Sequence, residues 1–378
     1  MGRKRGSVRR KATRRRERPW EWRDEPHGLV AAILEGRSTA IIGSIGILEG
    51  GVTLRVIESG IGELIQPPDL DGFREWNREK KTRALVDKVM TDAEAISRFV
   101  YDGCYIGTEL YGTVRCPMTL VREVVRQGKK ELRVAGQGVT ELDLWLGAGL
   151  VKTLDITYIG LEVFGVSNAL RRAVESGQVE KVVEWSNGGI TWRFKATSMG
   201  VPFVPVRAML GTDTLKYSAA KVVEDPFTGM KVCLIPALIL DVGLIHVHRA
   251  DKYGNAQIDG ISGFAFELSR ASKRLIISAE EIVDSEEIRR SPDRTIIPYY
   301  LVDAVVHAPY GSHPGEMAYC YGRDERQLRE WVEVSKTEEG TQAYLKKYIY
   351  DLPDHQAYLE LIGQERLEQL RAEEEGRR

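Results

Sequence analysis

The sequence predicts an α/β fold with an open, mostly parallel sheet and helices on both of its faces. From about residue 83 onward, short apolar segments with strand character alternate with amphipathic helical segments. One of them, Val242–Val247, is apolar almost throughout, which is typical of a central strand buried on both faces. In such sheets, functional residues gather in the loops that follow the carboxyl ends of the strands.

Each element has its own local signal. Thr91 and Glu94 have the spacing of a capping box, so they predict a helix that begins near Asp92 and ends before Gly103. A strand is expected at Tyr105, and a second helix from Pro117 to Gly128. Further strands are expected at 132–135, 155–158, 181–184, 203–206, 231–235 and 273–277, and further helices at 167–177, at 192–199 and from residue 324 onward.

Three parts of the chain differ in composition. Residues 1–75 are predicted to form a basic, poorly ordered extension, because residues 1–24 contain eleven Lys or Arg and no clear period follows them. The extension has three readings: an appended arm, a loose linker, or translation from a start codon placed too far upstream. Residues 76–350 are expected to form the main domain, and residues 351–378 a helical tail rich in charge.

The overall composition excludes several classes. The formal net charge of -1 gives the 378-residue chain no bias toward nucleic acid or a membrane. None of the four cysteines forms a Cys-x-x-Cys pair, which argues against a zinc site and favours free thiols in the cytoplasm. Apolar runs all fall short of the ~20 residues that a membrane helix needs.

Two glycine-containing loops are candidates for binding an oxyanion or a phosphate. The first, near Gly107 and Gly112, can expose backbone N–H groups, although an ordinary glycine turn explains it equally well. The second is Ser186-Asn187-Gly188, whose alternative explanation is the N-cap of a helix. A third segment, 136–141, resembles a dinucleotide fingerprint but has Glu141 at the third glycine, which excludes that class.

Histidines supply the remaining candidates. His246 and His248 alternate in a strand and share one face, so they are either a metal pair or, as we expect, hydrogen-bonded core residues. His313 lies in a polar loop and is either a donor to substrate or a turn residue.

Several segments together resemble the A subunit of family I coenzyme A transferases of the glutaconate type. They keep that family's order over roughly residues 80–350. The matching segments are 89–94, 115–118, 186–188, 202–205, 210–213, 224–229, 246–255 and 310–314. The resemblance implies an open α/β fold of the CoA-transferase (NagB/RpiA-like) type, no permanently bound cofactor, an acyl-CoA and a carboxylic acid as substrates, and the B subunit of the CoA transferase as partner.

The resemblance also implies covalent chemistry that this chain does not complete alone. In that family the B subunit has a glutamate, in a Ser-Glu-Asn-Gly motif, that attacks the acyl-CoA thioester and then carries the coenzyme A. The related place here reads Ser186-Asn187-Gly188, and an amide is a poor nucleophile. The nucleophile is therefore expected in the partner, with this chain shaping the acyl pocket.

The resemblance assigns substrate binding to Arg115, Ser186, Asn187, Gly188 and His313, and loop shape to Gly107 and Gly112. Glu109 stands in a loop that is usually richer in glycine; it is a candidate base if buried beside substrate, and otherwise a surface or ion-paired residue. Three alternatives stay open. The first is an acyl-CoA hydrolase or lyase that opens a ring or a carbon–carbon bond, whose branch has a glutamate near position 187. The others are a non-catalytic ligand-binding regulator of the same fold with a nucleic-acid-binding arm, and a sugar-phosphate isomerase of similar fold.

Overall fold

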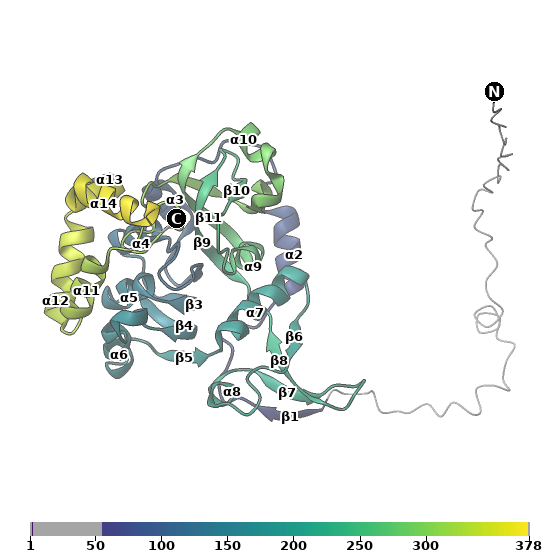
Figure 1. Ribbon diagram of the computed structural model, residues 1–378. Helices are drawn as coiled ribbons and strands as arrows, with labels where there is room; N and C mark the ends of the chain where they lie inside the picture. Colours follow the sequence, from purple (N-terminus) through teal and green to yellow (C-terminus); the bar gives the residue numbers. More distant parts are fainter. Residues whose placement is uncertain (1, 3–54, 377–378) are drawn as a thin grey trace, which may run out of the picture. The chain divides into compact units, whose positions relative to one another are not determined.

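The computed structural model describes residues 55–376 and Gly2, so all of the basic tract of residues 1–24 except Gly2 lies outside the described residues. The central feature is a mostly parallel sheet in which β13, β11, β9, β2, β3, β4 and β5 run side by side (Figure 1). Their bounds are β2 Tyr105–Thr108, β3 Leu132–Gly138, β4 Val151–Ile159, β5 Lys181–Glu184, β9 Leu240–Ala250, β11 Ser272–Ile282 and β13 Ala304–His307. Two short antiparallel strands, β10 (Ala256–Gln257) and β12 (Thr295–Ile297), extend the sheet beside the end of β9.

Helices cover both faces of this sheet, as the alternating pattern predicts. One face carries α3 (Asp92–Phe99), α4 (Met118–Arg126), α5 (Thr140–Gly147) and α6 (Asn168–Glu175), and the other carries α7 (Asn187–Met199) and α9 (Ala265–Arg270). Side chains alternate between the two cores along each strand: Ile106 and Leu244 face the first, and Tyr105 and Ile245 face the second. The central position expected for Val242–Val247 is confirmed, because β9 is buried along nearly its whole length.

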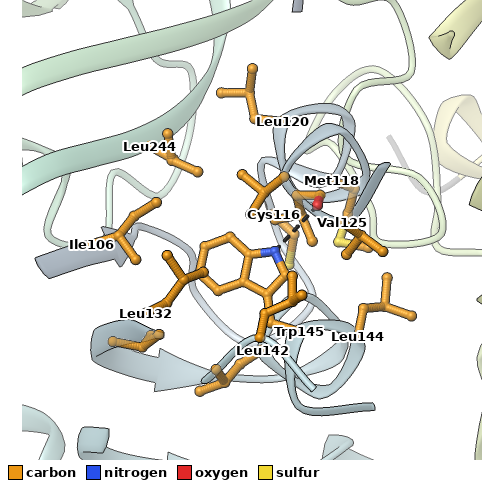
Figure 2. Close-up of a cluster of buried hydrophobic side chains, with 14 of the residues drawn as sticks. Ile106, Cys116, Met118, Leu120, Val125, Leu132, Leu142, Leu144, Trp145 and Leu244 are labelled. Carbon is orange, nitrogen blue, oxygen red and sulfur yellow. Dashed lines mark hydrogen bonds between the residues drawn. The ribbon is translucent and has the colours of Figure 1, made fainter. Parts of the chain in front are cut away.

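Trp145 of α5 lies at the centre of the first core (Figure 2). Its indole is fully buried among aliphatic side chains from α4, β2, β3 and β9, and its Nε1–H donates to the carbonyl oxygen of Val121 at 3.2 Å. The ring therefore contributes apolar area without leaving a buried donor unpaired.

A second, smaller sheet was not predicted. Its four antiparallel strands lie in the order β1 (Val56–Ser59), β7 (Lys221–Glu224), β8 (Lys231–Pro236) and β6 (Phe203–Val206). The expectation that 203–206 and 231–235 continue one parallel sheet is wrong, because the short turn after Glu224 folds β8 back onto β7 as a hairpin.

The ends of the main domain also differ from the predicted boundaries. The boundary at residue 75 falls inside α2 (Leu70–Glu79), and β1 already pairs with β7, so ordered structure begins well before residue 76. The C-terminal third is helical as expected: α11 Glu325–Val334, α12 Glu338–Leu345, a π-helical turn Lys346–Tyr350, α13 His355–Ile362 and α14 Gln364–Glu375. The segment predicted as a tail packs against the domain, because Leu367 and Leu370 are buried. The remaining α-helices of the described residues are α8 Asp213–Tyr217 and α10 Ser285–Arg290.

Local signals located α3 and the carboxyl-terminal part of α7. The capping box of α3 is confirmed, with Thr91 and Glu94 each bonded to the other's backbone N–H. The helix predicted at 192–199 begins earlier, at Asn187, because Ser186 is its N-cap and accepts a hydrogen bond from the N–H of Gly189 at 2.9 Å.

Candidate functional site

The candidate site lies where parallel strands β2, β5 and β13 reach their carboxyl ends. Three loops leave the sheet there: residues 109–117 after β2, residues 185–186 before α7, and residues 308–316 after β13. Because parallel strands end at one edge of a sheet, these loops lie on the same side of the molecule. They contain most of the residues that the sequence singles out.

A buried ion pair organises the first loop. Glu109 and Arg115 are both fully buried, and they form a bidentate pair with Nη1–Oε2 and Nη2–Oε1 distances of 2.8 and 2.9 Å. The guanidinium also donates to the carbonyl oxygens of His246 and Ile261, at 3.1 Å each. Arg115 itself has a left-handed backbone with φ of 59°, so the pair holds a loop shape that a free chain would rarely adopt.

These contacts leave Glu109 and Arg115 without a free polar atom directed at solvent. Oε1 of Glu109 accepts a further bond from the N–H of Phe264 at 3.2 Å, and a Cβ on Gly263 would lie 2.2 Å from that oxygen. Burial raises the pKa of Glu109, and the Arg115 guanidinium opposes that rise. The structure therefore shows Glu109 as an ion-paired glutamate, and its carboxylate is buried.

The two candidate glycines have different roles. The expectation that Gly107 shapes the loop is wrong, because Gly107 lies within β2. There a Cβ would approach Leu240 Cδ1 to 2.6 Å and the carbonyl oxygen of Ala135 to 2.9 Å, so glycine allows close packing of neighbouring strands. Gly112 does shape the loop: it has φ of 61° in the tight turn between Tyr111 and Val114.

The first turn of α7 presents the second group of candidates. Asn187 is exposed, and its Oδ1 accepts a hydrogen bond from the Thr157 hydroxyl at 2.5 Å. Its amide nitrogen has no hydrogen bond to the described residues, so the NH₂ group faces outward. Ser186 caps only the N–H of Gly189, so the N–H groups of Asn187 and Gly188, at the positive end of a 13-residue helix, have no hydrogen bond within residues 55–376. This turn therefore offers several donors to an anion or a carbonyl oxygen.

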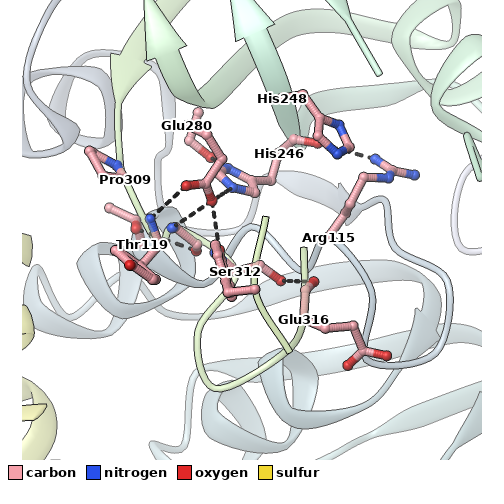
Figure 3. A network of polar contacts seen from close by, with 12 residues as sticks. Arg115, Thr119, His246, His248, Glu280, Pro309, Ser312 and Glu316 are labelled. Carbon is pink, nitrogen blue, oxygen red and sulfur yellow. Dashed lines mark hydrogen bonds and ion pairs between the residues drawn. The ribbon is translucent and has the colours of Figure 1, made fainter. Parts of the chain in front are cut away.

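A carboxylate that sequence reasoning missed, Glu280, connects β11 with the third loop (Figure 3). Its oxygens accept bonds from His246 Nε2 at 2.8 Å, the Tyr321 hydroxyl at 2.6 Å and the backbone N–H groups of Tyr310 and Gly311 at 2.7 and 3.2 Å. On its other side, His246 Nδ1 lies 2.8 Å from the Ser278 hydroxyl. A pairing between residues 34 positions apart in separate strands leaves no local signal in the sequence.

The other two candidate histidines, His248 and His313, are interior residues. Both ring nitrogens of His248 form hydrogen bonds: Nε2 lies 2.8 Å from the carbonyl oxygen of Ala318, and Nδ1 accepts from the N–H of Asp259 at 3.1 Å. Burial lowers the pKa of His248 to about 4. The expectation that His246 and His248 are hydrogen-bonded core residues is therefore confirmed. His313 is fully buried between Tyr358, 2.7 Å from Nδ1, and Asp324, 3.3 Å from Nε2. The structure thus places His313 under the C-terminal helices and away from the exposed turn of α7.

Glu141, which breaks the dinucleotide fingerprint, is a fully buried carboxyl at the start of α5. Both of its oxygens accept from the N–H of Val139, at 3.1 and 3.0 Å, and Cys116 Sγ lies 4.0 Å from Oε2. Burial raises the pKa of Glu141 to about 8, because the backbone hydrogen bonds offset only part of the desolvation. This group is therefore mostly protonated at neutral pH.

Two kinds of site are not present in residues 55–376. No group of three or more His, Cys, Asp or Glu side chains is arranged to hold a metal ion. No helix among them has both the length and the apolar character needed to cross a membrane.

Comparison with known proteins gives a consistent result. The family model described as Coenzyme A transferase matches residues 89–308. The A subunit of glutaconate CoA-transferase from Acidaminococcus fermentans is 34% identical over 301 residues, which cover 75% of this chain and 94% of that protein. The crystal structure of glutaconate coenzyme A-transferase from the same species has a TM-score of 0.72 at 33% identity, covering 75% of this chain and 95% of that one. The IpdA subunit of a cholesterol ring-cleaving hydrolase from Mycobacterium tuberculosis is 31% identical over 276 residues, 70% of this chain and 94% of that protein.

Proposed function

Because the chain belongs to the coenzyme A transferase family, we propose that it works as the A subunit of a two-chain enzyme that moves coenzyme A from an acyl-CoA to a carboxylic acid. The partner is the B subunit, which supplies the nucleophilic glutamate. Coenzyme A enters as a thioester substrate, and no cofactor stays bound between turnovers. The relatives named as A subunits support this division of labour.

The observation that carries the proposal is the first turn of α7. It has unpaired donors but no carboxylate: Ser186, Asn187 and Gly188 are all neutral. In the loop that follows β2, the carboxylate of Glu109 is held by Arg115 and has no free path to a thioester. The turn of α7 is thus suited to hold a carbonyl or carboxylate oxygen while another group performs the attack.

The donors of α7 fit the charge that develops in such a reaction. When a glutamate of the partner attacks the thioester, the carbonyl oxygen becomes an oxyanion, and the departing coenzyme A leaves as a thiolate. The Asn187 amide and the N–H of Gly188 are fixed before the reaction, the amide by its bond to Thr157, so they stabilise that oxyanion without reorganising. The thiolate then attacks the glutamyl carbonyl of the acyl-glutamyl anhydride, which releases the donor acid as a carboxylate and leaves a glutamyl-CoA thioester. The acceptor carboxylate attacks this thioester and expels the thiolate, which attacks the acceptor's acyl carbon in the new anhydride and regenerates the glutamate.

The direct test combines activity with trapping of the covalent intermediate. The chain should exchange coenzyme A between an acyl-CoA and a free acid only when it is co-purified with its partner. Mass spectrometry of the complex incubated with acyl-CoA should find the coenzyme A adduct on a glutamate of the partner. An adduct on this chain, or exchange by this chain alone, would contradict the proposal.

The similarity to a ring-cleaving hydrolase subunit defines a second outcome of the same assay. A ring-cleaving hydrolase would break a carbon–carbon bond of its acyl-CoA with water and leave the thioester intact, so it would consume the acyl-CoA without an acceptor acid and form no acyl-CoA of the acceptor. A transferase requires the acceptor. The exposed amide of Asn187, in place of a carboxylate that could activate water, favours transfer.

A further inference from the structure

A cleft of about 190 Å³ opens at the opposite edge of the sheet, where β11 and β13 begin. Its walls come from the end of α2, the end of α9 and the segment before β13. The lining residues are Asn77, Lys81, Arg83, Arg270, Ser272, Tyr300 and Leu301. Three of these side chains are cationic, and none is a carboxylate.

Arg270 is held in place with part of its guanidinium unused. Nη1 donates to the carbonyl oxygens of Phe266 at 3.1 Å and Ile296 at 3.3 Å, and to the Ser269 hydroxyl at 3.2 Å. The guanidinium also stacks on the Phe266 ring, 3.6 Å from its centroid. Nε and Nη2 have no hydrogen bond within residues 55–376, so two fixed donor positions remain for a ligand. The nearby carboxylate of Glu267 is ion-paired with Lys195 at 3.2 Å.

Lys81 places a second, buried cation in the same wall. Its Nζ donates to the carbonyl oxygen of Lys273 at 2.8 Å and to Asp303 Oδ2 at 3.0 Å, which leaves one of its three N–H bonds unassigned. Asp303 is shared, because its other oxygen accepts from Arg274 at 2.8 Å. One carboxylate therefore faces two cations, and the region keeps an excess of positive charge.

Two further donors of the cleft are unpaired. The exposed guanidinium of Arg83 and the hydroxyl of Tyr300 make no hydrogen bond to any residue that the structure describes, and neither forms an ion pair there. Tyr300 lies close enough to Arg270 to interact with its charge. Donors from three separate segments thus converge on one small space.

We propose that this cleft binds a phosphate group. Its contents are cations and neutral donors, its volume suits one tetrahedral oxyanion, and guanidinium groups pair well with phosphate oxygens. The eleven residues of β11 separate the cleft from the carboxyl edge by roughly 33 Å at the usual rise per residue. The site is therefore distinct from the turn of α7, and its existence does not depend on the proposed transferase activity.

The test measures phosphate binding to the full chain, with its partner if the two co-purify. Isothermal titration with sodium phosphate at constant ionic strength should give a binding isotherm for the unchanged protein. Arg83→Glu should weaken binding at least about tenfold, because it replaces an attraction by a repulsion. Arg171→Glu is the matched control, since Arg171 is equally exposed but lies on α6. Tyr300→Phe, which removes only the hydroxyl, should weaken binding by a smaller factor.

The phosphate can be a free ion or a part of coenzyme A, and the same variants separate these sources. If Arg83→Glu weakens binding of orthophosphate only, the ligand is the free anion. If it weakens binding of coenzyme A but not of 3′-dephospho-coenzyme A, the ligand is the 3′-phosphate. Either result supports the site. Equal affinities of the unchanged protein and Arg83→Glu for all three compounds would overturn it, as would binding to the unchanged protein only above about 10 mM.

Discussion

Replacing Glu109 by glutamine should lower the free energy of unfolding by about 3–5 kcal/mol, the usual effect of removing one partner of a buried ion pair. Both members of this pair are fully buried, and the guanidinium of Arg115 would keep its place between two carbonyl oxygens with no counter-charge. The amide preserves the volume of the side chain, so the loss comes from charge and not from a cavity. For a domain of this size, each kcal/mol lost from the free energy of unfolding lowers Tm by about 2 °C, so the expected decrease in Tm is roughly 6–10 °C.

Urea unfolding at 25 °C, followed by tryptophan fluorescence, measures this quantity. The double variant Glu109→Gln with Arg115→Met should recover much of the loss, because it removes the charge that the single variant leaves uncompensated. Glu325→Gln is the control: that glutamate also has arginine partners, at 3.2 and 3.3 Å, but it is exposed and should cost less than about 1 kcal/mol. A loss below about 1 kcal/mol for Glu109→Gln, or strictly additive single changes, would refute the reasoning.

Asn187→Ala should reduce kcat/KM for coenzyme A exchange by about 10²-fold without changing Tm, because it removes one exposed donor. Gln364→Ala, which removes another exposed amide, should leave exchange unchanged. An unaltered rate in Asn187→Ala would exclude the role assigned to Asn187. Burial lowers the pKa of His355 to about 3, so between pH 6.5 and 3 this side chain is protonated only in the unfolded chain. The free energy of unfolding should therefore fall on acidification by up to about 1.4 kcal/mol per pH unit. His355→Gln should show a shallower decline in urea midpoints from pH 7 to 5. Glu141, whose pKa is raised to about 8, should change stability in the opposite direction: the free energy of unfolding should fall as pH rises from 4.5 to 8. A Glu141→Gln variant that keeps this pH dependence would contradict the raised pKa of Glu141.

The sequence predicted those parts of the fold that depend on residues close together in the chain. The helix of Thr91 and Glu94 has a capping box whose two hydrogen bonds span three residues. β9 is recognisable because a strand buried on both faces has a nearly continuous apolar run, here Val242–Ile245. The small antiparallel sheet was missed for a physical reason. Its strands have the same composition as short parallel strands, and only the hairpin between β7 and β8 distinguishes them.

The sequence predicted where the candidate residues lie in the fold but not what they contact. Glu109 and Asn187 do follow the carboxyl ends of β2 and β5, as the alternation of strands and helices indicates. The roles of Arg115 and His246 depend on partners that the register of the sheet brings together: Ser278 lies opposite His246, and Glu280 follows two residues later on the same face. Residues that meet only through this register are not paired by any spacing in the sequence.

Buried charged side chains at this edge are paired within the protein, which agrees with the proposal that the nucleophile comes from a second chain. Glu109 and Arg115 pair with each other, and Glu280 pairs with His246 and with the backbone N–H groups of residues 310 and 311. These contacts fix the loops at residues 109–117 and 308–316. An oxyanion is stabilised best by donors that do not move when charge develops. Under the proposed function the first turn of α7 has to meet that requirement, and Asn187 is held there by the Thr157 hydroxyl. The covalent step then resides in the second chain, and this chain supplies donors that are in place before the reaction.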